Sequence, residues 1–344
     1  MSSRVPVVAL TGHLGAGKTT LLNHLLRQPG ARVGVVVNDF GAVNVDAGLV
    51  SGQVDEPASI AGGCLCCLED VGGLDDALGR LAEPRRALDV IVVEASGIAE
   101  PGALAQLIRA SGAANTRPGG VVDVVDAVEY FDTVDGGGLP PARFAAATLV
   151  VLNKCDLLPE DEREARLARI EARVREINPG VHVVRTSAGQ VDPALVYDVA
   201  STEEPEDELP IAALMRAERA ASASHSHAAS ATRSTPGPVA AGALTALLED
   251  PPPGAYRIKG TVAVHTGGRP QGYVVHVVGR QVHVAPCPPP GESTLVAIGL
   301  HLDPDVVGPA LEAALGPASV ADRGWVENHF HLRRHLPSAR EEHR

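Results

Sequence analysis

The sequence of 344 residues predicts an α/β fold: a doubly wound, mostly parallel sheet followed by a smaller α+β domain. In the first half, short runs of Val, Ile and Leu show little alternation with polar residues, which is typical of strands buried on both faces. Segments with helical spacing lie between these runs, and this order indicates a parallel sheet with connecting helices. The 45% apolar content is sufficient for a large core.

The elements of the first domain follow from this pattern, and we place the domain at 1–200. The expected strands are 7–10, 33–37, 90–93, 121–125, 149–152 and 181–184, and the expected helices are 19–26, 74–81 and 162–177. In the last of these helices Leu167, Ile170 and Val174 recur at helical spacing, which predicts one buried face.

The composition changes after residue 200 to acidic residues, then Ala and Ser, then prolines. This change predicts a linker over 201–254 with one short helix near 211–220. The runs 256–264, 272–278 and 281–285 alternate as antiparallel strands do, and a helix is expected at 304–315. We therefore predict an α+β domain over 255–316 and a frayed tail over 317–344.

The charge and the cysteines limit the environment and the partners. The net charge of -13 opposes binding to nucleic acid or to an anionic membrane, because both require clustered Lys and Arg. The first residues lack the pattern of a signal peptide, and no apolar run approaches a membrane span, so a cytoplasmic location is expected. In the reducing cytoplasm, the five cysteines are not expected to form disulfides.

A phosphate-binding loop connects the first expected strand to the first expected helix. It fits G-x-x-x-x-G-K-[ST] completely, in the strand and helix context that this motif requires. Backbone N–H groups and the helix N-terminus would hold the phosphates, Lys18 would bridge the β- and γ-phosphates, and Thr19 would bind Mg²⁺. The predicted nucleotide-binding residues of the loop are Gly12, His13, Leu14, Gly15, Ala16, Gly17, Lys18, Thr19 and Thr20.

A second motif, Asn153-Lys154-Cys155-Asp156, follows the expected strand 149–152 and has the N-K-x-D pattern of GTPases. The Asp156 carboxylate can accept hydrogen bonds from both N1–H and the exocyclic amine of guanine, whereas adenine presents a repulsive lone pair. The motif therefore favours GTP and GDP over adenine nucleotides. Residues 187–189, Ser-Ala-Gly, would complete the guanine pocket.

An acidic residue and a glycine follow the strand 90–93. Glu94 would hold Mg²⁺ through water or orient the attacking water, and Gly97 would contact the γ-phosphate through its N–H. A Glu that merely caps the next helix is the alternative. The predicted catalytic set is Lys18, Thr19, Glu94 and Gly97, with Thr19 and Glu94 at the magnesium ion.

Three cysteines, Cys64, Cys66 and Cys67, lie between the second strand and the Glu94 strand. Thiolates are soft ligands for Zn²⁺, Cu⁺ or cobalt, and three of them leave one open position on a tetrahedral ion. A redox dithiol is the competing interpretation, because Cys64 and Cys67 have C-x-x-C spacing, but no thioredoxin-like pattern surrounds them. Metal binding is therefore favoured.

Taken together, these motifs resemble the CobW family of P-loop GTPases. The resemblance rests on the segments GxxGxGKTT, Asn38-Asp39-Phe40-Gly41, GGCLCC, ExSG and NKCD, and it extends to 257–260 and 295–299 in the C-terminal domain. It implies a metallochaperone or metal-insertion factor with Cys64, Cys66 and Cys67 as metal ligands and 38–46 as the first switch region. Asp39 stands where the family usually has Glu and is the remaining candidate ligand, whereas Ala42 replaces a second acidic residue.

The leading hypothesis is a GTP-hydrolysing metallochaperone that transfers zinc, or cobalt or another transition metal, to an apo-metalloenzyme client. Slow intrinsic turnover is expected because no arginine finger precedes the first switch region. A metal sensor or buffer that binds GTP without delivery is the alternative, and N-K-x-D argues against a small-molecule kinase. The sequence leaves open whether the chain forms a homodimer. His13 has no assigned role, His225 and His227 would form at best a weak metal-scavenging site, and chelation by His329, His331 and His335 is disfavoured.

Overall fold

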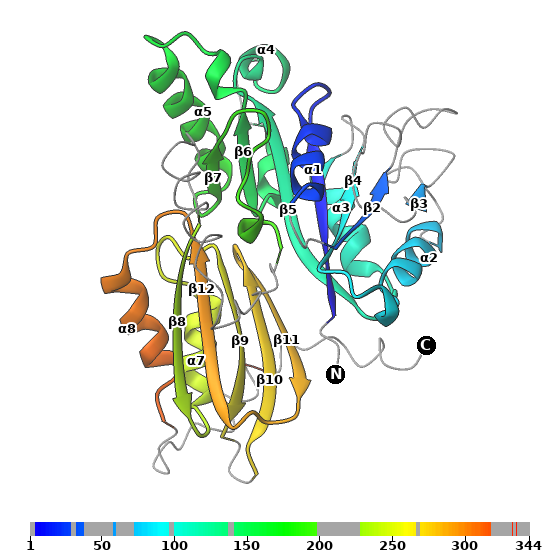
Figure 1. Ribbon diagram of the computed structural model, residues 1–344. Helices are drawn as coiled ribbons and strands as arrows, with labels where there is room; N and C mark the ends of the chain where they lie inside the picture. Colours follow the sequence, from blue (N-terminus) through cyan, green and yellow to red (C-terminus); the bar gives the residue numbers. More distant parts are fainter. Residues whose placement is uncertain are drawn as a thin grey trace, which may run out of the picture. The chain divides into compact units, whose positions relative to one another are not determined.

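The computed structural model divides the chain into two compact units, residues 4–227 and residues 228–344 with the first three residues. Each unit is described by itself (Figure 1). The structure describes residues 4–28, 32–37, 58–59, 72–95, 100–136, 141–197, 228–265, 269–317, 332 and 335.

The first unit contains a seven-stranded sheet in which every neighbouring pair is parallel. The strand order is β3-β2-β4-β1-β5-β6-β7. The strands are β1 (Val5–Gly12), β2 (Val33–Val37), β3 (Ala58–Ser59), β4 (Val90–Glu94), β5 (Thr116–Asp126), β6 (Leu149–Asn153) and β7 (His182–Arg185). This sheet confirms the predicted fold class and the six predicted strands.

Helices bury the sheet on both faces. The helices are α1 (Lys18–Leu26), α2 (Gly72–Leu81), α3 (Pro101–Ala110), α4 (Tyr130–Thr133) and α5 (Arg163–Ile177). Ala9 of β1 belongs to a buried cluster with α2 and α3, whereas α1 contacts β1 without joining that cluster. Val8 and Leu10, equally buried, alternate with Ala9 and point to the opposite face. The sequence had not predicted α3, whose short apolar stripe follows Pro101.

The parallel arrangement brings the ends of four strands together. Leu10 of β1 pairs with Glu94 of β4, and Asp126 of β5 pairs with Asn153 of β6. Gly12 ends β1 beside β5. In an open α/β sheet, ligands bind at the carboxyl ends of the strands. The polar residues predicted from separate motifs therefore meet at one edge of this sheet.

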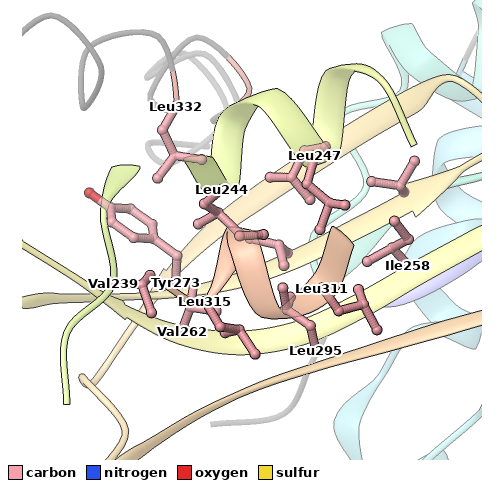
Figure 2. Close-up of a cluster of buried hydrophobic side chains, with 14 of the residues drawn as sticks. Val239, Leu244, Leu247, Ile258, Val262, Tyr273, Leu295, Leu311, Leu315 and Leu332 are labelled. Atoms are coloured by element: carbon pink, nitrogen blue, oxygen red, sulfur yellow. The ribbon is translucent and has the colours of Figure 1, made fainter. Parts of the chain in front are cut away.

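The second unit is an antiparallel five-stranded sheet with two helices. Its strand order is β11-β10-β9-β12-β8. The elements are β8 (Ala229–Pro236), α7 (Ala241–Glu249), β9 (Arg257–Val264), β10 (Gln271–Val278), β11 (Gln281–Cys287), β12 (Glu292–Gly299) and α8 (Pro304–Ala314). Both helices contribute to the buried cluster of this unit (Figure 2). The predicted α+β architecture is confirmed.

The predicted linker 201–254 is wrong from residue 228 onward, because β8 and α7 occupy that stretch. The Ala, Ser and Thr residues of β8 pair with β12 along the whole strand, from Ala229 opposite Gly299 to Pro236 opposite Glu292. Leu244 and Leu248 of α7 are fully buried. Backbone hydrogen bonds to β12 hold this strand in place. Its small and polar residues are also typical of a linker, so the composition alone could not distinguish the two. The short helix expected near 211–220 lies outside the described residues.

The predicted frayed tail is contradicted at both of its described positions beyond residue 317. Leu332 is fully buried and belongs to the core of the second unit, in the same cluster as Leu244 (Figure 2). The His335 carbonyl accepts a hydrogen bond from the backbone N–H of Val284 at 3.1 Å, and His335 Nε2 lies 3.0 Å from a Glu249 carboxylate oxygen. One apolar side chain and one edge-strand hydrogen bond anchor this part of the chain.

The described part of the chain contains neither a cluster of metal-ligating side chains nor a membrane-spanning helix. No three or more His, Cys, Asp or Glu side chains there lie close enough to hold a metal ion. Within the same ranges, none of the helices has the length and apolar character that a membrane-spanning segment needs.

We expect Leu332→Ala to lower the free energy of unfolding by about 2–5 kcal/mol, because it removes a fully buried side chain and leaves a cavity. Val306→Ala in α8 is the control, since Val306 is 44% exposed and should change stability by less than about 0.5 kcal/mol. Urea unfolding of the full chain measures both. Equal midpoints for the two variants would contradict the anchoring role of Leu332.

Burial lowers the pKa of His182 in β7 to about 4, from 6.5. Between these two pH values the unfolded chain binds more protons than the folded one, so the stability should fall as the pH decreases from 6.5 toward 4. His182→Gln removes this proton uptake. We expect a shallower decline of the melting temperature over that pH range in the variant than in the wild type, and parallel declines would contradict a buried neutral imidazole.

Candidate nucleotide-binding site

The phosphate loop has a backbone conformation that two glycines make possible. Gly12 has φ 145°, and a Cβ there would lie 2.4 Å from the Val124 carbonyl oxygen. Gly17 has φ 102°, and a Cβ there would lie 2.2 Å from the Asn153 side-chain nitrogen. Both positive φ values are disfavoured for L side chains, so the motif glycines are required by conformation and by space.

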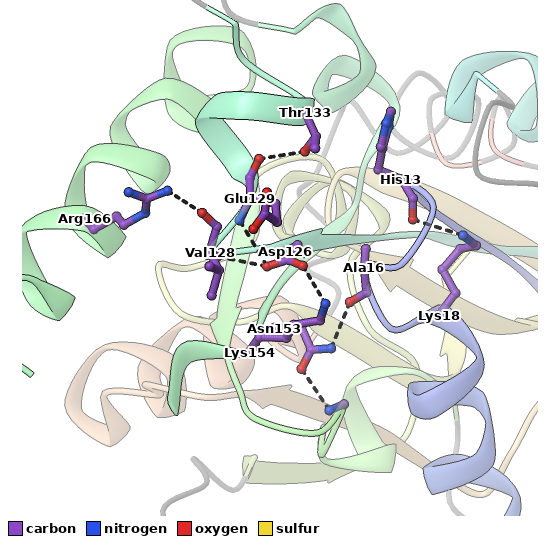
Figure 3. Close-up of polar contacts among 11 residues, drawn as sticks. His13, Ala16, Lys18, Asp126, Val128, Glu129, Thr133, Asn153, Lys154 and Arg166 are labelled. Atoms are coloured by element: carbon purple, nitrogen blue, oxygen red, sulfur yellow. Dashed lines mark hydrogen bonds and ion pairs between the residues drawn. The ribbon is translucent and has the colours of Figure 1, made fainter. Parts of the chain in front are cut away.

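Lys18 begins α1 and turns back over the loop. Its Nζ donates to the carbonyl oxygens of Gly12 at 3.0 Å and His13 at 3.2 Å, and only 8% of the residue is exposed (Figure 3). The ammonium group is therefore held at the loop whose N–H groups would surround phosphate. A helix N-terminus at the same place adds a favourable dipole for an anion.

Thr19 and Glu94 come together from α1 and the end of β4. Thr19 Oγ1 donates to Glu94 Oε1 at 3.2 Å, and Glu94 is 3% exposed. The alternative function of Glu94, capping the next helix, is wrong, because α3 begins at Pro101 with Glu100 as its N-cap residue. A hydroxyl and a carboxylate are oxygen ligands of the kind that Mg²⁺ prefers, so these two residues fit a magnesium ion.

Asn153 connects the phosphate loop with the loop after β7. Its Nδ2 donates to the Ala16 carbonyl at 2.9 Å, and its Oδ1 accepts from the Gly189 N–H at 2.9 Å (Figure 3). The side chain is 2% exposed, and each half of the amide has a backbone partner. This contact brings the predicted guanine-pocket segment 187–189 beside the phosphate loop.

The rest of the N-K-x-D motif turns away from β6 at Lys154, which has φ 61°. Lys154 Nζ forms an ion pair with Asp126 Oδ2 at 2.6 Å. The Asp156 backbone N–H donates to Ser187 Oγ at 3.3 Å, and the residue itself is exposed, so its carboxylate can reach a base. Cys155 is buried in the variable position, and burial raises the pKa of its thiol.

Two buried aspartates of β5 were missed by the sequence reasoning. Asp123 accepts from Thr11 Oγ1 at 2.8 Å and from Arg143 at 2.7 and 2.9 Å. Burial opposes the charge of Arg143, but the Asp123 carboxylate more than offsets this and raises the pKa of Arg143. Asp126 binds Lys154 as described. The available signal was two acidic residues in the otherwise apolar run 121–126, since buried charges are normally paired.

Several predicted residues lie outside the part of the chain that the structure describes. These are Asp39 and the whole segment 38–46, Gly97, Cys64, Cys66 and Cys67, and His225, His227, His329 and His331. The structure brings together the phosphate loop, Glu94 and the N-K-x-D motif. The metal-ligand assignments stay predictions.

Comparison with family models gives two matches along the chain. A model of the CobW/HypB/UreG nucleotide-binding domain matches residues 6–185. A model of the cobalamin synthesis protein CobW C-terminal domain matches residues 228–315. The second match begins at the residue where the second structural unit begins.

Curated relatives match over little more than half of this chain. The zinc chaperone YjiA of Escherichia coli is 34% identical over 203 residues, covering 56% of this chain and 61% of the relative. A zinc-regulated GTPase metalloprotein activator 1 of Dictyostelium discoideum is 29% identical over 54% of this chain and 46% of its own length. The zinc chaperone CobW of Pseudomonas aeruginosa is 32% identical over 55% of this chain and 58% of its own length. The matches thus span about half to six tenths of these relatives.

Two solved structures match this chain at lower sequence identity. The Zn(II)-bound YjiA GTPase from E. coli is 22% identical, and the alignment covers 93% of this chain and 100% of that one with a TM-score of 0.42. HypB from Helicobacter pylori in complex with nickel is 16% identical over 54% of this chain and 80% of that one, with a TM-score of 0.40.

We expect Gly17→Ala to weaken GDP binding at least tenfold, because the new Cβ would displace the Asn153 side chain from the Ala16 carbonyl. Gly79→Ala in α2 is the matched control, since nothing lies within 4 Å of a Cβ there. It should leave the affinity unchanged and add slight helix stability. Titration with a fluorescent GDP analogue measures both variants, and equal affinities would contradict the steric argument.

Proposed function

This chain belongs to the CobW/HypB/UreG family, and from that premise we propose that it is a GTP-hydrolysing metallochaperone. In this proposal it binds zinc at Cys64, Cys66 and Cys67 and couples the transfer of zinc to GTP binding and hydrolysis. The observation that carries the nucleotide part is the Asn153 amide, which joins the phosphate loop to the loop of the predicted guanine pocket. The relatives named as zinc chaperones support the choice of metal.

The described residues suit the hydrolysis of GTP to GDP and phosphate. Lys18 and the N–H groups of the phosphate loop would hold the β- and γ-phosphates. Thr19 and Glu94 would hold Mg²⁺, which when bound neutralises charge on the phosphate oxygens. Glu94 or water bound near it would orient the attacking water, and Gly97 would contact the γ-phosphate. The Asp156 carboxylate would accept hydrogen bonds from N1–H and the exocyclic amine of guanine.

The zinc ion is the cargo in this proposal. Three thiolates supply three of four tetrahedral positions, and Asp39 or a ligand from the client would supply the fourth. Such an incomplete set suits transfer, because a client can add a ligand before this chain releases its own. Cobalt and other transition metals are the alternative cargo, since thiolates do not select zinc alone.

Strand pairing provides a short path between the nucleotide and the proposed metal segment. Val37 at the end of β2 pairs with Glu94 on one side and with Ser59 of β3 on the other. Asp39 follows Val37 by two residues, and Cys64 follows Ser59 by five. A shift of Glu94 between the GTP and GDP states would therefore act on a strand that leads directly into the predicted switch region. This supports coupling, which must be reciprocal.

A metal sensor or buffer that binds GTP without delivery is the second candidate. It shares the nucleotide site but predicts the same zinc affinity with GDP and with GTP, together with no transfer to a client. In the proposed chaperone, intrinsic hydrolysis is slow, the location is cytoplasmic, and the partner is an apo-metalloenzyme. A homodimer would allow two copies to share the metal.

We expect Cys66→Ser to weaken zinc binding at least tenfold, because it removes a thiolate ligand. Cys287→Ser in β11 is the control, since it also removes one thiol but leaves the three-cysteine segment intact. Competition with a zinc chelator measures both variants and the wild type, each with GDP and with a non-hydrolysable GTP analogue.

The wild type should show a difference in zinc affinity of about 5–150-fold between the two nucleotide states, the usual range of allosteric coupling. Equal affinities in both states would overturn the chaperone mechanism and favour the sensor, while leaving the GTPase assignment intact. Unchanged zinc affinity in Cys66→Ser would overturn the assignment of the metal site.

A further inference from the structure

Asp126 stands at the end of β5, beside the motif that is proposed to read guanine, and no motif assigns it a role. From its contacts we infer that Asp126 is a positioning residue for base specificity, which acts through Lys154 on the carboxylate of Asp156. This inference rests on the proposed function, since it presupposes that Asp156 binds guanine.

The Asp126 carboxylate has a fixed orientation. Its Oδ1 accepts backbone hydrogen bonds from Val128 N–H at 2.9 Å and Glu129 N–H at 3.2 Å (Figure 3). Its Oδ2 lies 2.6 Å from Lys154 Nζ. Only 7% of the residue is exposed. Both oxygens are engaged, so the carboxylate can hold the lysine in one place.

Lys154 needs such a partner because of its backbone. It has φ 61°, a left-handed conformation that costs about 1 kcal/mol or more for a residue other than Gly, Asn or Asp. At this residue the chain leaves the direction of β6 and enters the short helical turn Cys155–Leu157, which contains Asp156. If Lys154 relaxed toward the right-handed region, the turn would rotate and carry the Asp156 carboxylate with it.

The other contacts that hold this turn are longer, including the hydrogen bond from the backbone N–H of buried Cys155 to the Thr186 carbonyl at 3.1 Å. The Asp156 N–H bonds to Ser187 at 3.3 Å, and the Arg163 guanidinium reaches the Asp156 carbonyl at 3.4 Å. Both contacts are exposed to solvent, which weakens them. The 2.6 Å contact with Asp126 is charge-assisted and partly shielded, so it is the strongest restraint on the left-handed residue.

The phosphate side of the site has its own restraints. Asn153 is bound to the Ala16 carbonyl and the Gly189 N–H, and Lys18 is bound to the Gly12 and His13 carbonyls. Neither set includes Asp126. Loss of the Asp126 charge should therefore affect recognition of the base more than binding of the phosphates.

The test compares GDP with inosine diphosphate (IDP), which lacks the exocyclic amine from which the Asp156 carboxylate would accept a hydrogen bond. Asp126→Asn keeps the shape of the side chain and an oxygen for the N–H groups of Val128 and Glu129, but removes the charge that holds Lys154. We expect the GDP-to-IDP affinity ratio, measured by calorimetry on the full chain, to fall about three- to tenfold. The affinity for pyrophosphate, which has no base, should change by less than twofold.

Two further variants separate positioning from stability. Asp135→Asn also removes a buried carboxylate charge, the one that binds Arg173 at 2.6 and 3.0 Å, and it should leave the GDP-to-IDP ratio unchanged. Lys154→Met should lower the ratio as Asp126→Asn does, and the double variant should lower it no further. Lys154→Met also serves as the test if Asp126→Asn does not fold.

An unchanged ratio in Asp126→Asn or Lys154→Met would overturn the inference while leaving the proposed function intact. Additive losses in the double variant would overturn it as well, because they would show that Asp126 acts by another route. If the wild type bound GDP and IDP equally, guanine recognition by Asp156 would itself fail, and the proposed function with it.

Discussion

One buried side-chain amide holds the nucleotide site together. Asn153 donates to Ala16 of the phosphate loop and accepts from Gly189 of the loop after β7, segments that are far apart in the chain. Its full burial means that loss of either partner would leave a polar group without compensation. The geometry of the base pocket therefore depends on the phosphate loop, and the requirement for glycine at residue 17 follows from the same contact.

The sheet makes this contact possible. Because its strands are parallel, their carboxyl ends meet at one edge, where β1 delivers Gly12 of the phosphate loop and three other strands deliver the polar residues Glu94, Asp126 and Asn153. The strands themselves are almost entirely apolar, so their positions are set by close packing. Side chains that project from such a core have little freedom to move, which suits the proposed preorganised contacts with phosphate and guanine.

The fold of the first unit and the loop residues of its site could be predicted, because buried strands and the glycine-rich motif have strong local patterns. Asp126 could not, since its role arises from a lysine 28 residues later in the chain. Strand β8 and the buried Leu332 were missed for a related reason. Pairing with β12 and burial in the core of the second unit decide their structure, and neither partner is local in sequence.

Strand β5 carries two buried carboxylates, and each is matched to one cation. Asp123 binds Arg143, in the helical turn Ala142–Ala146, and accepts a hydrogen bond from Thr11 just before the phosphate loop, whereas Asp126 binds Lys154 within the base motif. Desolvation offsets most of the attraction in such pairs, so they contribute little to net stability, but a charge left without its partner is costly. The pairs therefore act mainly as constraints: each penalises any arrangement in which its cation leaves the strand. One strand thus fixes the base motif through the Asp126–Lys154 ion pair and holds Thr11, the residue before the phosphate loop, through Asp123, contacts that a purely apolar strand would lack.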